Sequence, residues 1–246
     1  MSSSSPSKRS VADPKAKSSG NFLWVILAVL AIAAVVIGLV VWQANNQRTS
    51  DLADRASIEY SGEMHYADGV VTLSAADVAE GTPEVSLYED FSCPYCADLA
   101  LATDEQMLDE VENGNLIVNI HPLNFMDDGA EGHSTHALAA VLPLAEAGDT
   151  NAYLNLRQLL FEDQKSVYNQ WGPEQFAEAA KAFEGSGDAV DAIREGDVSQ
   201  AKTVGQDNGD QLEELTGTVS SPRILQDGKD IEIQDMNQWV SQVVGQ

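Results

Sequence analysis

The chain has 246 residues, of which 43% are hydrophobic, so it is long enough for one sizeable domain with attachments and is not disordered throughout. Asp and Glu outnumber Lys and Arg by 39 to 13, a formal net charge of −26, which argues against nucleic acid or an anionic membrane surface as the main partner of the folded part. The two cysteines, Cys93 and Cys96, exclude a small scaffold held by several disulfides and leave a redox-active or metal-binding pair.

The N-terminal region combines a polar tail with a long apolar run. Residues 1–20 are rich in serine and poor in apolar side chains, which is typical of a disordered tail. Phe22 to Trp42 are 21 consecutive residues without a charge. A helix of this length matches the roughly 30 Å hydrocarbon core of a bilayer, and Trp24 and Trp42 lie near its ends, where interfacial aromatic residues are common. We therefore expect residues 21–43 to form a single transmembrane helix.

The residues around this run predict its orientation. A cleavable signal peptide is a poorer explanation, because its apolar segment usually has only about 7–15 residues and no cleavage motif follows here. Four basic residues precede the run, whereas Arg48 and Arg55 follow it together with Asp51 and Asp54. The excess of positive charge on the N-terminal side predicts a cytoplasmic tail and an extracytoplasmic domain, hence a single-pass protein of the cell membrane. The polar residues 44–66 are expected to form a linker.

The folded domain, expected over residues 67–246, should begin with a βαβ unit. Glu84–Phe91 is a strand candidate that ends at the cysteine pair, and a helix should run from the pair to about Asn113. Asn115–His121 should then form a second strand, parallel to the first. A weaker candidate for an edge strand, Val70–Leu73, precedes this unit.

Helical spacing of apolar residues dominates the middle of the domain, and Gly-Asp, Gly-Pro or Gly-Ser breaks separate the segments. Helices are predicted near residues 133–147, 150–163, 173–184, 188–195 and 197–214. Strand-like segments then return on both sides of Asp227-Gly228, a common signal for a tight hairpin. A last helix is expected from about Gln234 to Val244.

The motif Cys93-Pro94-Tyr95-Cys96 lies where the predicted strand ends and the helix begins. Backbone N–H groups and the dipole at a helix N-terminus stabilise an anion, so the pKa of Cys93 should be lowered and its thiolate populated. A thiolate attacks disulfides, and a second thiol three residues later can resolve the mixed disulfide. We predict that Cys93 is the exposed nucleophile, that Cys96 is the shielded resolving thiol, and that Pro94 suits the first helical turn.

Two other uses of the cysteine pair are weaker. His133 and His136 could complete a Cys2His2 zinc site, but the 36 intervening residues exceed the usual spacing. A purely structural disulfide would gain little from closing so short a loop. We therefore expect no metal and no bound cofactor, and we interpret His133, His136, His65 and His121 as ordinary surface or helix-cap residues.

Two separated motifs carry a family resemblance. Tyr88–Cys96 resembles the active-site segment of the DsbA-like thiol–disulfide oxidoreductases, and Thr216–Pro222 resembles the second active-site loop of the same family. The resemblance covers roughly residues 68–246 and includes the order of the elements. It implies an α/β thioredoxin fold with an inserted helical domain, which falls at about residues 125–214 here.

The second loop of this family carries a cis-proline beside the cysteines. The resemblance implies that the Ser221–Pro222 bond is cis and that the backbone of Ser221 lies against Cys93, where its N–H and C=O can pair with an extended client chain. Ser221 stands where many relatives carry Thr or Val, and Tyr95 stands where the best-known member carries His. We expect Ser221 to alter the binding of the client chain. We expect Tyr95 to lower the oxidising power, because it supplies no cation that would stabilise the Cys93 thiolate.

Two carboxylates immediately precede the cysteine motif. Asp90 is a candidate for moving protons to and from Cys96, and it is equally well explained as a polar residue that caps the strand end and faces solvent. For Glu89, the solvent-facing interpretation is favoured.

The leading hypothesis is an anchored, extracytoplasmic dithiol oxidase. It would donate the Cys93–Cys96 disulfide to exported unfolded proteins with cysteine pairs, in a compartment where disulfides persist. The resemblance implies re-oxidation by a membrane partner of quinone-coupled type. A disulfide reductase or isomerase, and a non-catalytic binding module with the same fold, are the alternatives.

Overall fold

The computed structural model describes residues 20–53, 55, 58–232 and 235–245, and within the first of these ranges it describes the side chains at positions 24–40, 43 and 52. The chain divides into two compact units at Gln47 and Arg48. The tail predicted to be disordered, residues 1–20, lies outside the described residues except for its last position.

The first helix, α1 (Gly20–Ala53), contains the apolar run. The described side chains from Trp24 to Val40 are exposed. Where side chains are described, no helix reaches the length and hydropathy of a membrane span. The helix continues to Ala53, so the first part of the segment predicted as a linker, residues 44–66, is helical.

A six-stranded sheet forms the centre of the second unit, in the order β1-β2-β4-β3-β5-β6. Strands β3 and β4 are parallel, and every other neighbouring pair is antiparallel. The predicted βαβ unit is therefore confirmed. The strand bounds are β1 Glu63–Ala67, β2 Val70–Ser74, β3 Glu84–Asp90, β4 Ile117–Leu123, β5 Arg223–Gln226 and β6 Lys229–Asp230.

The edge of the sheet differs from the sequence prediction. Val70–Ser74 was expected at the edge, but β1 pairs with it in an antiparallel hairpin, so β2 lies second. The connecting residues Asp68 and Gly69 both have positive φ, 50° and 81°, which suits a tight hairpin turn. The sheet consequently starts at Glu63, four residues before the expected start of the domain.

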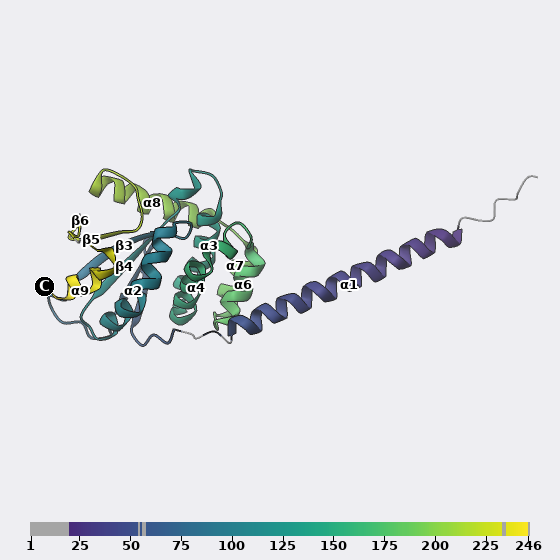
Figure 1. Cartoon of the computed structure of the whole chain (residues 1–246), viewed down its shortest axis with the longest axis horizontal. Coiled ribbons are helices and arrows are strands. Elements are labelled where there is room, and N and C mark those ends of the chain that lie inside the picture. The colour runs from purple at the N-terminus through teal and green to yellow at the C-terminus, as the bar shows by residue number, and fades with distance from the viewer. Residues whose placement is uncertain (1–19, 54, 56–57, 233–234, 246) are drawn as a thin grey trace, which may run out of the picture. The chain divides into compact units, whose positions relative to one another are not determined.

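Helices cover the sheet, and most of them come from one insertion between β4 and β5 (Figure 1). The prediction of an inserted helical region is confirmed, and its helices lie between Phe125 and Thr216. The last helix begins later than expected, after a 3-10 turn, and its expected first residue, Gln234, lies outside the described residues. The helix bounds are α2 Pro94–Glu112, η1 Phe125–Asp127, α3 His133–Ala147, α4 Thr150–Glu162, α5 Gln164–Val167, α6 Pro173–Ala182, α7 Gly187–Glu195, α8 Ser199–Thr216, η2 Met236–Gln238 and α9 Trp239–Val244.

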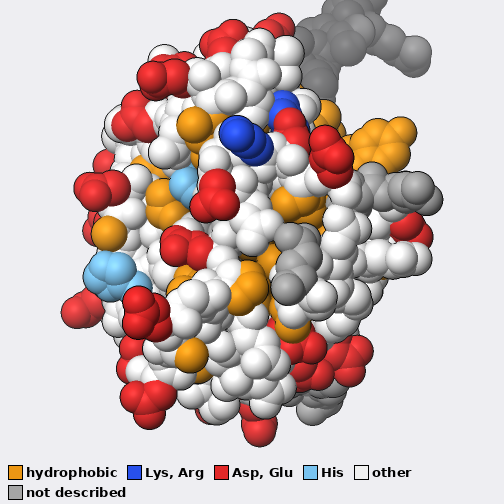
Figure 2. Space-filling model, turned by 90° about the vertical axis from the view of Figure 1, so that its left-hand side faces the viewer, with side chains coloured by type: hydrophobic (Ala, Val, Ile, Leu, Met, Phe, Trp, Pro, Cys, Tyr) orange, Lys and Arg blue, Asp and Glu red, His pale blue; other side chains and the backbone are white. Residues whose placement is uncertain are grey.

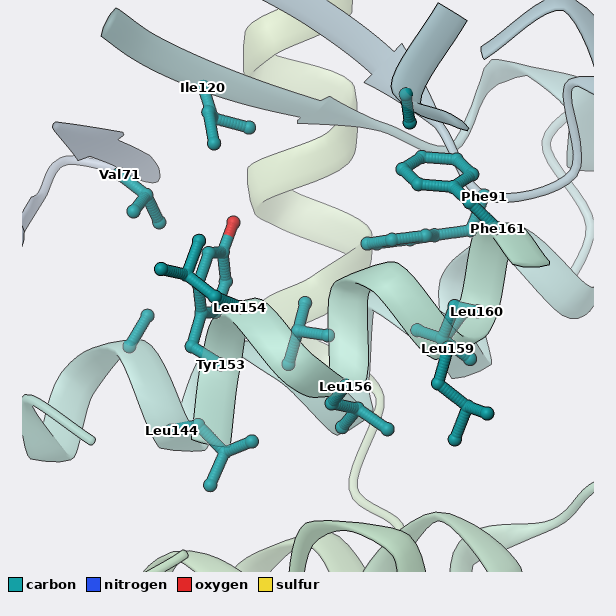
Figure 3. Packing of buried hydrophobic residues seen from close by; sticks show 14 of the residues in the cluster. Val71, Phe91, Ile120, Leu144, Tyr153, Leu154, Leu156, Leu159, Leu160 and Phe161 are labelled. Atoms are coloured by element: carbon teal, nitrogen blue, oxygen red, sulfur yellow. The ribbon is translucent and has the colours of Figure 1, made fainter. Parts of the chain in front are cut away.

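The core joins the sheet to the helical insertion. Figure 3 shows Tyr153 of α4 with the sheet residues Val71 and Ile120 on one side and Leu144 of α3 on the other. Phe91, the residue after β3, packs against Phe161 of α4 with ring centroids 5.1 Å apart. Buried aromatic pairs of this kind contribute both area burial and a preferred geometry. Because Phe91 lies two residues before Cys93, this packing fixes the segment that carries the cysteine pair.

Acidic side chains dominate the surface of the domain. On the face seen in Figure 2, Asp and Glu side chains are scattered widely, Lys and Arg are few, and apolar side chains appear between them. This distribution follows from the excess of 39 acidic over 13 basic residues. On this face, the described residues form no broad basic surface of the kind that phosphate backbones require.

Candidate active site

Cys93 is the N-cap of α2, and Pro94 is the first helical residue. The N–H groups of Cys96 and Ala97 donate to the carbonyl oxygen of Cys93, at 3.1 and 3.2 Å, which closes the first turn. Pro94 lacks an N–H, but this position of a helix leaves that donor without an intrahelical partner in any case. The local sequence thus places the first sulfur at a helix N-terminus, as predicted.

The second loop lies directly against the first cysteine. Arg223 pairs with Tyr88 in the antiparallel β3–β5 ladder, so the residues before β5 are carried to the end of β3. The Ser221–Pro222 bond is cis, and the Cys93 Sγ lies 3.4 Å from the carbonyl oxygen of Ser221. The two sequence motifs therefore meet, as the resemblance implied.

The prediction that Cys93 is exposed is wrong. Its exposed fraction is 4%, close to the 2% of Cys96, because the loop ending at Pro222 covers it. Both thiols are free in the structure. Tyr95, between them, is 73% exposed and marks the outer face of the motif.

The two thiols differ strongly in acidity. A hydrogen bond from the Cys96 thiol, with further ones from the backbone N–H groups of Cys96 and Tyr95, lowers the pKa of Cys93 to about 5 despite its burial. Burial, together with the hydrogen bond to Cys93, raises the pKa of Cys96 well above its ordinary value. One sulfur is therefore a thiolate at neutral pH and the other a thiol.

We expect iodoacetamide to alkylate Cys93 with a pH–rate midpoint near 5, because only the thiolate reacts. Cys96 should stay unmodified up to pH 9 in the folded protein, since its raised pKa keeps it protonated. Mass spectrometry of the reduced full-length protein after timed quenching gives both rates. A Cys93 midpoint above pH 8 would contradict the assignment, and the Cys93→Ala variant supplies the background rate.

Asp90 is fully buried, so the interpretation as a solvent-facing cap is wrong. Its Oδ1 accepts hydrogen bonds from Ser92 N at 2.8 Å and Ser134 Oγ at 2.5 Å, and its Oδ2 accepts one from Met126 N at 3.2 Å. Its own N–H donates to the Cys96 Sγ over 3.5 Å. Burial outweighs these bonds and raises the pKa of Asp90 to about 6. Asp90 thus ties the cysteine loop to α3 and η1 of the insertion.

Glu89 is also buried, with 3% exposure, and the prediction that it faces solvent is wrong. Both of its carboxylate oxygens accept hydrogen bonds from Arg157 at 2.7 Å, and Arg157 also binds Asp104. Sequence reasoning missed this cluster. Two signals in the sequence could have indicated it. Glu89 lies in the first parallel strand, which is expected to be covered on both faces, and Arg157 is the single arginine in the apolar helix 150–162.

Gln164 is another residue that sequence reasoning did not find. Its Nε2 donates to the carbonyl oxygens of Phe91 and Cys93, at 2.9 and 3.0 Å. Backbone carbonyls just before a helix need such partners when they are buried. The helical insertion therefore holds the backbone of the cysteine loop from a second side.

Two of the four histidines are buried, contrary to the prediction that all lie at the surface or at helix caps. His121 stacks on Tyr88 with ring centroids 4.3 Å apart, and His133 lies edge-on to Tyr168 at 5.1 Å. Burial lowers the pKa of both to about 4, so both are neutral at pH 7. His65 is exposed and His136 partly so, as expected.

Comparisons with known proteins agree with this geometry. The family model described as thioredoxin matches residues 79–243. The chain is 37% identical to the MdbA protein, a thiol-disulfide oxidoreductase from Corynebacterium diphtheriae, over 78% of this chain and 98% of that one, with a TM-score of 0.75. The MdbA protein from Corynebacterium matruchotii is 30% identical, covers 80% and 99% of the two chains, and gives a TM-score of 0.76.

A more distant structure shares the fold. DsbA from Mycobacterium tuberculosis in its reduced form is 19% identical, with coverage of 72% and 93% and a TM-score of 0.56. No curated protein sequence matches this chain. Because the family model covers more than half of the chain and the MdbA proteins are covered almost completely, the chain belongs to the thioredoxin family and is a DsbA-like thiol–disulfide oxidoreductase whose active-site pair is Cys93 and Cys96.

Proposed function

We propose that this oxidoreductase works as an oxidase, which donates the Cys93–Cys96 disulfide to exported unfolded proteins that contain pairs of cysteines. The observation that carries this direction is the difference in acidity between the two thiols. A thiolate that is stabilised at Cys93 favours the reduced enzyme, and an enzyme with a stabilised reduced form is a strong oxidant of other thiols.

The reaction balances in two steps. A client thiolate attacks the Sγ of Cys93, the Cys93–Cys96 bond breaks, and Cys96 leaves with the bonding electrons and takes up a proton. The client's second thiolate then attacks the client sulfur of the mixed disulfide and releases Cys93 as a thiolate. The client is oxidised to a disulfide and the enzyme is reduced by two electrons. Low basicity makes Cys93 a good leaving group in the second step.

Client binding is assigned to the loop around Ser221 and Pro222. The carbonyl oxygen of Ser221 lies 3.4 Å from the attacked sulfur, and β5 begins two residues later. An extended client chain that pairs with the backbone of Ser221 would bring its cysteine to Cys93 without any requirement on its side chains. Tyr95, which is 73% exposed, offers an apolar surface beside that path. Pro94 and Asp90 support the site by holding the helix start and the loop.

Two further parts of the proposal rest on the sequence. The uncharged run from Phe22 to Trp42, with its excess of basic residues on the N-terminal side, supports a single membrane anchor with a cytoplasmic N-terminus and an extracytoplasmic catalytic domain. Re-oxidation needs an electron acceptor, which we assign to a membrane partner of quinone-coupled type. Protease protection of intact cells and inverted vesicles tests the orientation, because only an outward-facing domain is digested in intact cells.

Oxidative refolding tests the function. A reduced multi-cysteine protein is mixed with stoichiometric, oxidised full-length enzyme in detergent, and native disulfides are counted over time. We expect them to form much faster than with Cys93→Ala, which removes the attacked sulfur and leaves the chain otherwise unchanged. Equal rates with the two proteins would exclude the oxidase, and rapid reduction of an already oxidised client would favour a reductase instead.

A further inference from the structure

A groove lies beside the second active-site loop, between η1 and α8. Its volume is about 420 Å³, and its walls are the loop that carries η1, one face of α8 and the second loop at Val219. Val219 precedes Ser221 by two residues, and the carbonyl oxygen of Ser221 lies 3.4 Å from the Cys93 Sγ. The groove, which we call the η1–α8 groove, therefore starts at the loop to which client binding is assigned.

Two glycines on α8, Gly205 and Gly209, form the floor of the groove. They are four residues apart and so lie on the same face of the helix. At Gly205, a Cβ atom would come within 2.4 Å of the Asn124 side chain, so glycine lets Asn124 pack against the helix there. At Gly209, the nearest atom to an added Cβ would be the Cγ1 of Val219, at 4.0 Å. The described residues therefore leave the space above Gly209 free.

Carboxylates stand on two walls of this groove. Asp128 follows η1, Asp210 is on α8, and both side chains are exposed. Lys202 also lines the groove, but it pairs with Glu131 at 2.8 Å, so its charge is already compensated. Neither Asp128 nor Asp210 has an ion-pair partner in the part of the chain that the structure describes. The groove thus keeps two negative charges above a floor without side chains.

A lysine or arginine side chain is complementary to this groove in shape and in charge. Its apolar stem can lie along the glycine floor and against Phe125, which is 36% exposed, while its charged end reaches the carboxylates of Asp128 and Asp210. Acidic residues cover much of the domain, so charge alone would not distinguish this place from the rest of the surface. The η1–α8 groove differs because it has depth and lies next to the reacting sulfur.

We propose that the η1–α8 groove is a client subsite that takes a lysine or arginine of the client chain, two or three residues after the client cysteine. The inference rests on the proposed function and adds a substrate preference to it. A client strand that pairs antiparallel with the second loop runs from Ser221 towards Val219. At about 3.3 Å per residue, its basic residue then reaches the groove while its cysteine lies at Cys93. The subsite binds and orients the client, and no bond changes there.

The rate at which Cys93 attacks a set of synthetic peptides tests this preference. Each peptide has one cysteine, linked by a disulfide to thionitrobenzoate, and one lysine that is moved from three residues before the cysteine to three residues after it. The thiolate of Cys93 in the reduced full-length protein attacks the peptide sulfur, the disulfide breaks, and the coloured thionitrobenzoate anion leaves. Stopped-flow absorbance gives the second-order rate constant. All peptides have the same net charge, so general attraction to the acidic domain cancels.

We expect the peptides with lysine two or three residues after the cysteine to react about fivefold faster than those with lysine at the mirror positions before it, which is the upper range for exposed ion pairs. Glutamate at the favoured positions should give the slowest peptide, and high salt should reduce both effects. Equal rates at all positions, or a maximum before the cysteine, would overturn the proposal.

Single charge changes show whether the carboxylates of the groove cause the preference. Asp128→Asn and Asp210→Asn should each lower the ratio between the favoured and the mirror peptide by about twofold. Asparagine tolerates the positive φ of 51° at position 128, so the first variant keeps its backbone. The matched control is Asp207→Asn, an exposed residue of α8 outside the groove, which should leave the ratio unchanged. A ratio that all three variants leave unchanged contradicts the subsite.

Filling the groove tests its shape. Gly209→Leu places a side chain in the free space and keeps every charge, so it should abolish the preference, whereas Gly187→Leu, at a helical glycine of α7 that also has free space, should not. Loss of the wild-type preference as the enzyme concentration rises would assign the groove to a second copy of the chain instead. The peptide reaction does not depend on the direction of client oxidation. If the refolding assay fails while the preference holds, the oxidase is rejected and the subsite stands; the reverse result rejects the subsite alone.

Discussion

Replacing Arg157 with leucine is expected to lower the free energy of unfolding by about 3–5 kcal/mol, the range found when one member of a buried ion pair is removed. The substitution leaves Glu89 and Asp104 facing each other without a cation, at 4% and 14% side-chain exposure. Neither carboxylate has another basic partner among the described residues. Most of the loss therefore comes from two buried negative charges and less from the missing guanidinium contacts.

The loss should depend on pH. Protonation neutralises the abandoned carboxylates, so the deficit of Arg157→Leu relative to wild type should shrink as the pH falls from 7 to 4. Urea unfolding of the full-length protein in detergent, followed by tryptophan fluorescence, measures both values, since Trp239 is completely buried in the domain. If the introduced leucine merely packed poorly, the deficit would stay constant over this range, because a packing defect has no titrating group.

Arg194 provides the control for this measurement. Its side chain is 35% exposed and lies within 4.0 Å of three carboxylates, at Asp191, Glu174 and Glu178. Arg194→Leu therefore also removes a cation from a group of acids, but at the surface, where the expected loss is about 1 kcal/mol or less. A loss at Arg157 no larger than that at Arg194 would show that the inner cluster is hydrated.

The sequence predicted the elements whose signals are local. The strand before the cysteine pair, the helix that starts at Pro94 and the helices of the insertion each have an apolar period and a recognisable boundary, and all are present. The site was predicted from the Cys93–Cys96 motif, which lies between a predicted strand and a predicted helix, because a helix N-terminus stabilises a thiolate beside it. Strand β1 was missed because Glu63–Ala67 is only five residues long and contains no β-branched residue, although it pairs with β2 in the folded chain.

The errors at the site have a common physical origin. Glu89, Asp90 and Cys93 were assigned by neighbours in the sequence, yet their burial is set by Arg157, Ser134 and Ser221, which lie between 44 and 128 positions away. Composition carries no information on such partners. The resemblance to a family supplied one long-range contact, Cys93 against Ser221, because its second motif marks that loop. It did not supply the acidic cluster, which only the folded chain brings together.

The reduced protein is expected to become more stable relative to the oxidised one as the pH rises from 5 to 7. The pKa of Cys93 is about 5 in the folded protein and 9.0 for an ordinary thiol. A group whose pKa is depressed on folding contributes stability that is fully present above the unfolded pKa and is lost as the pH falls through the folded pKa. Over the two pH units from 5 to 7, at about 1.4 kcal/mol per unit, this contribution grows by up to about 3 kcal/mol.

When the stabilities of the two redox forms are subtracted, the contributions of the other titrating groups largely cancel. Asp90, with its pKa raised to about 6, acts in the opposite sense: its contribution is present at low pH and is lost as the pH rises through 6. Because Asp90 is present in both forms, its effect largely cancels in the difference. Cys96 stays protonated in the folded reduced protein, so its contribution changes only near pH 9 and above, outside this window.

Urea unfolding of the reduced and the oxidised full-length protein at pH 5, 6 and 7 gives the difference directly. The disulfide closes a loop of only four residues and so adds little to the oxidised form. A lower stability of the oxidised form at pH 7 is the same free energy that drives donation of its disulfide, because the redox and unfolding equilibria form one thermodynamic cycle. The variant Cys93→Ala cannot form the disulfide. Its free energy of unfolding should therefore lack the pH-dependent contribution of the Cys93 thiolate, as that of the oxidised form does. A difference that does not change with pH, or an oxidised form that is the more stable one at pH 7, would point to a reductase and would place the Cys93 thiolate in doubt.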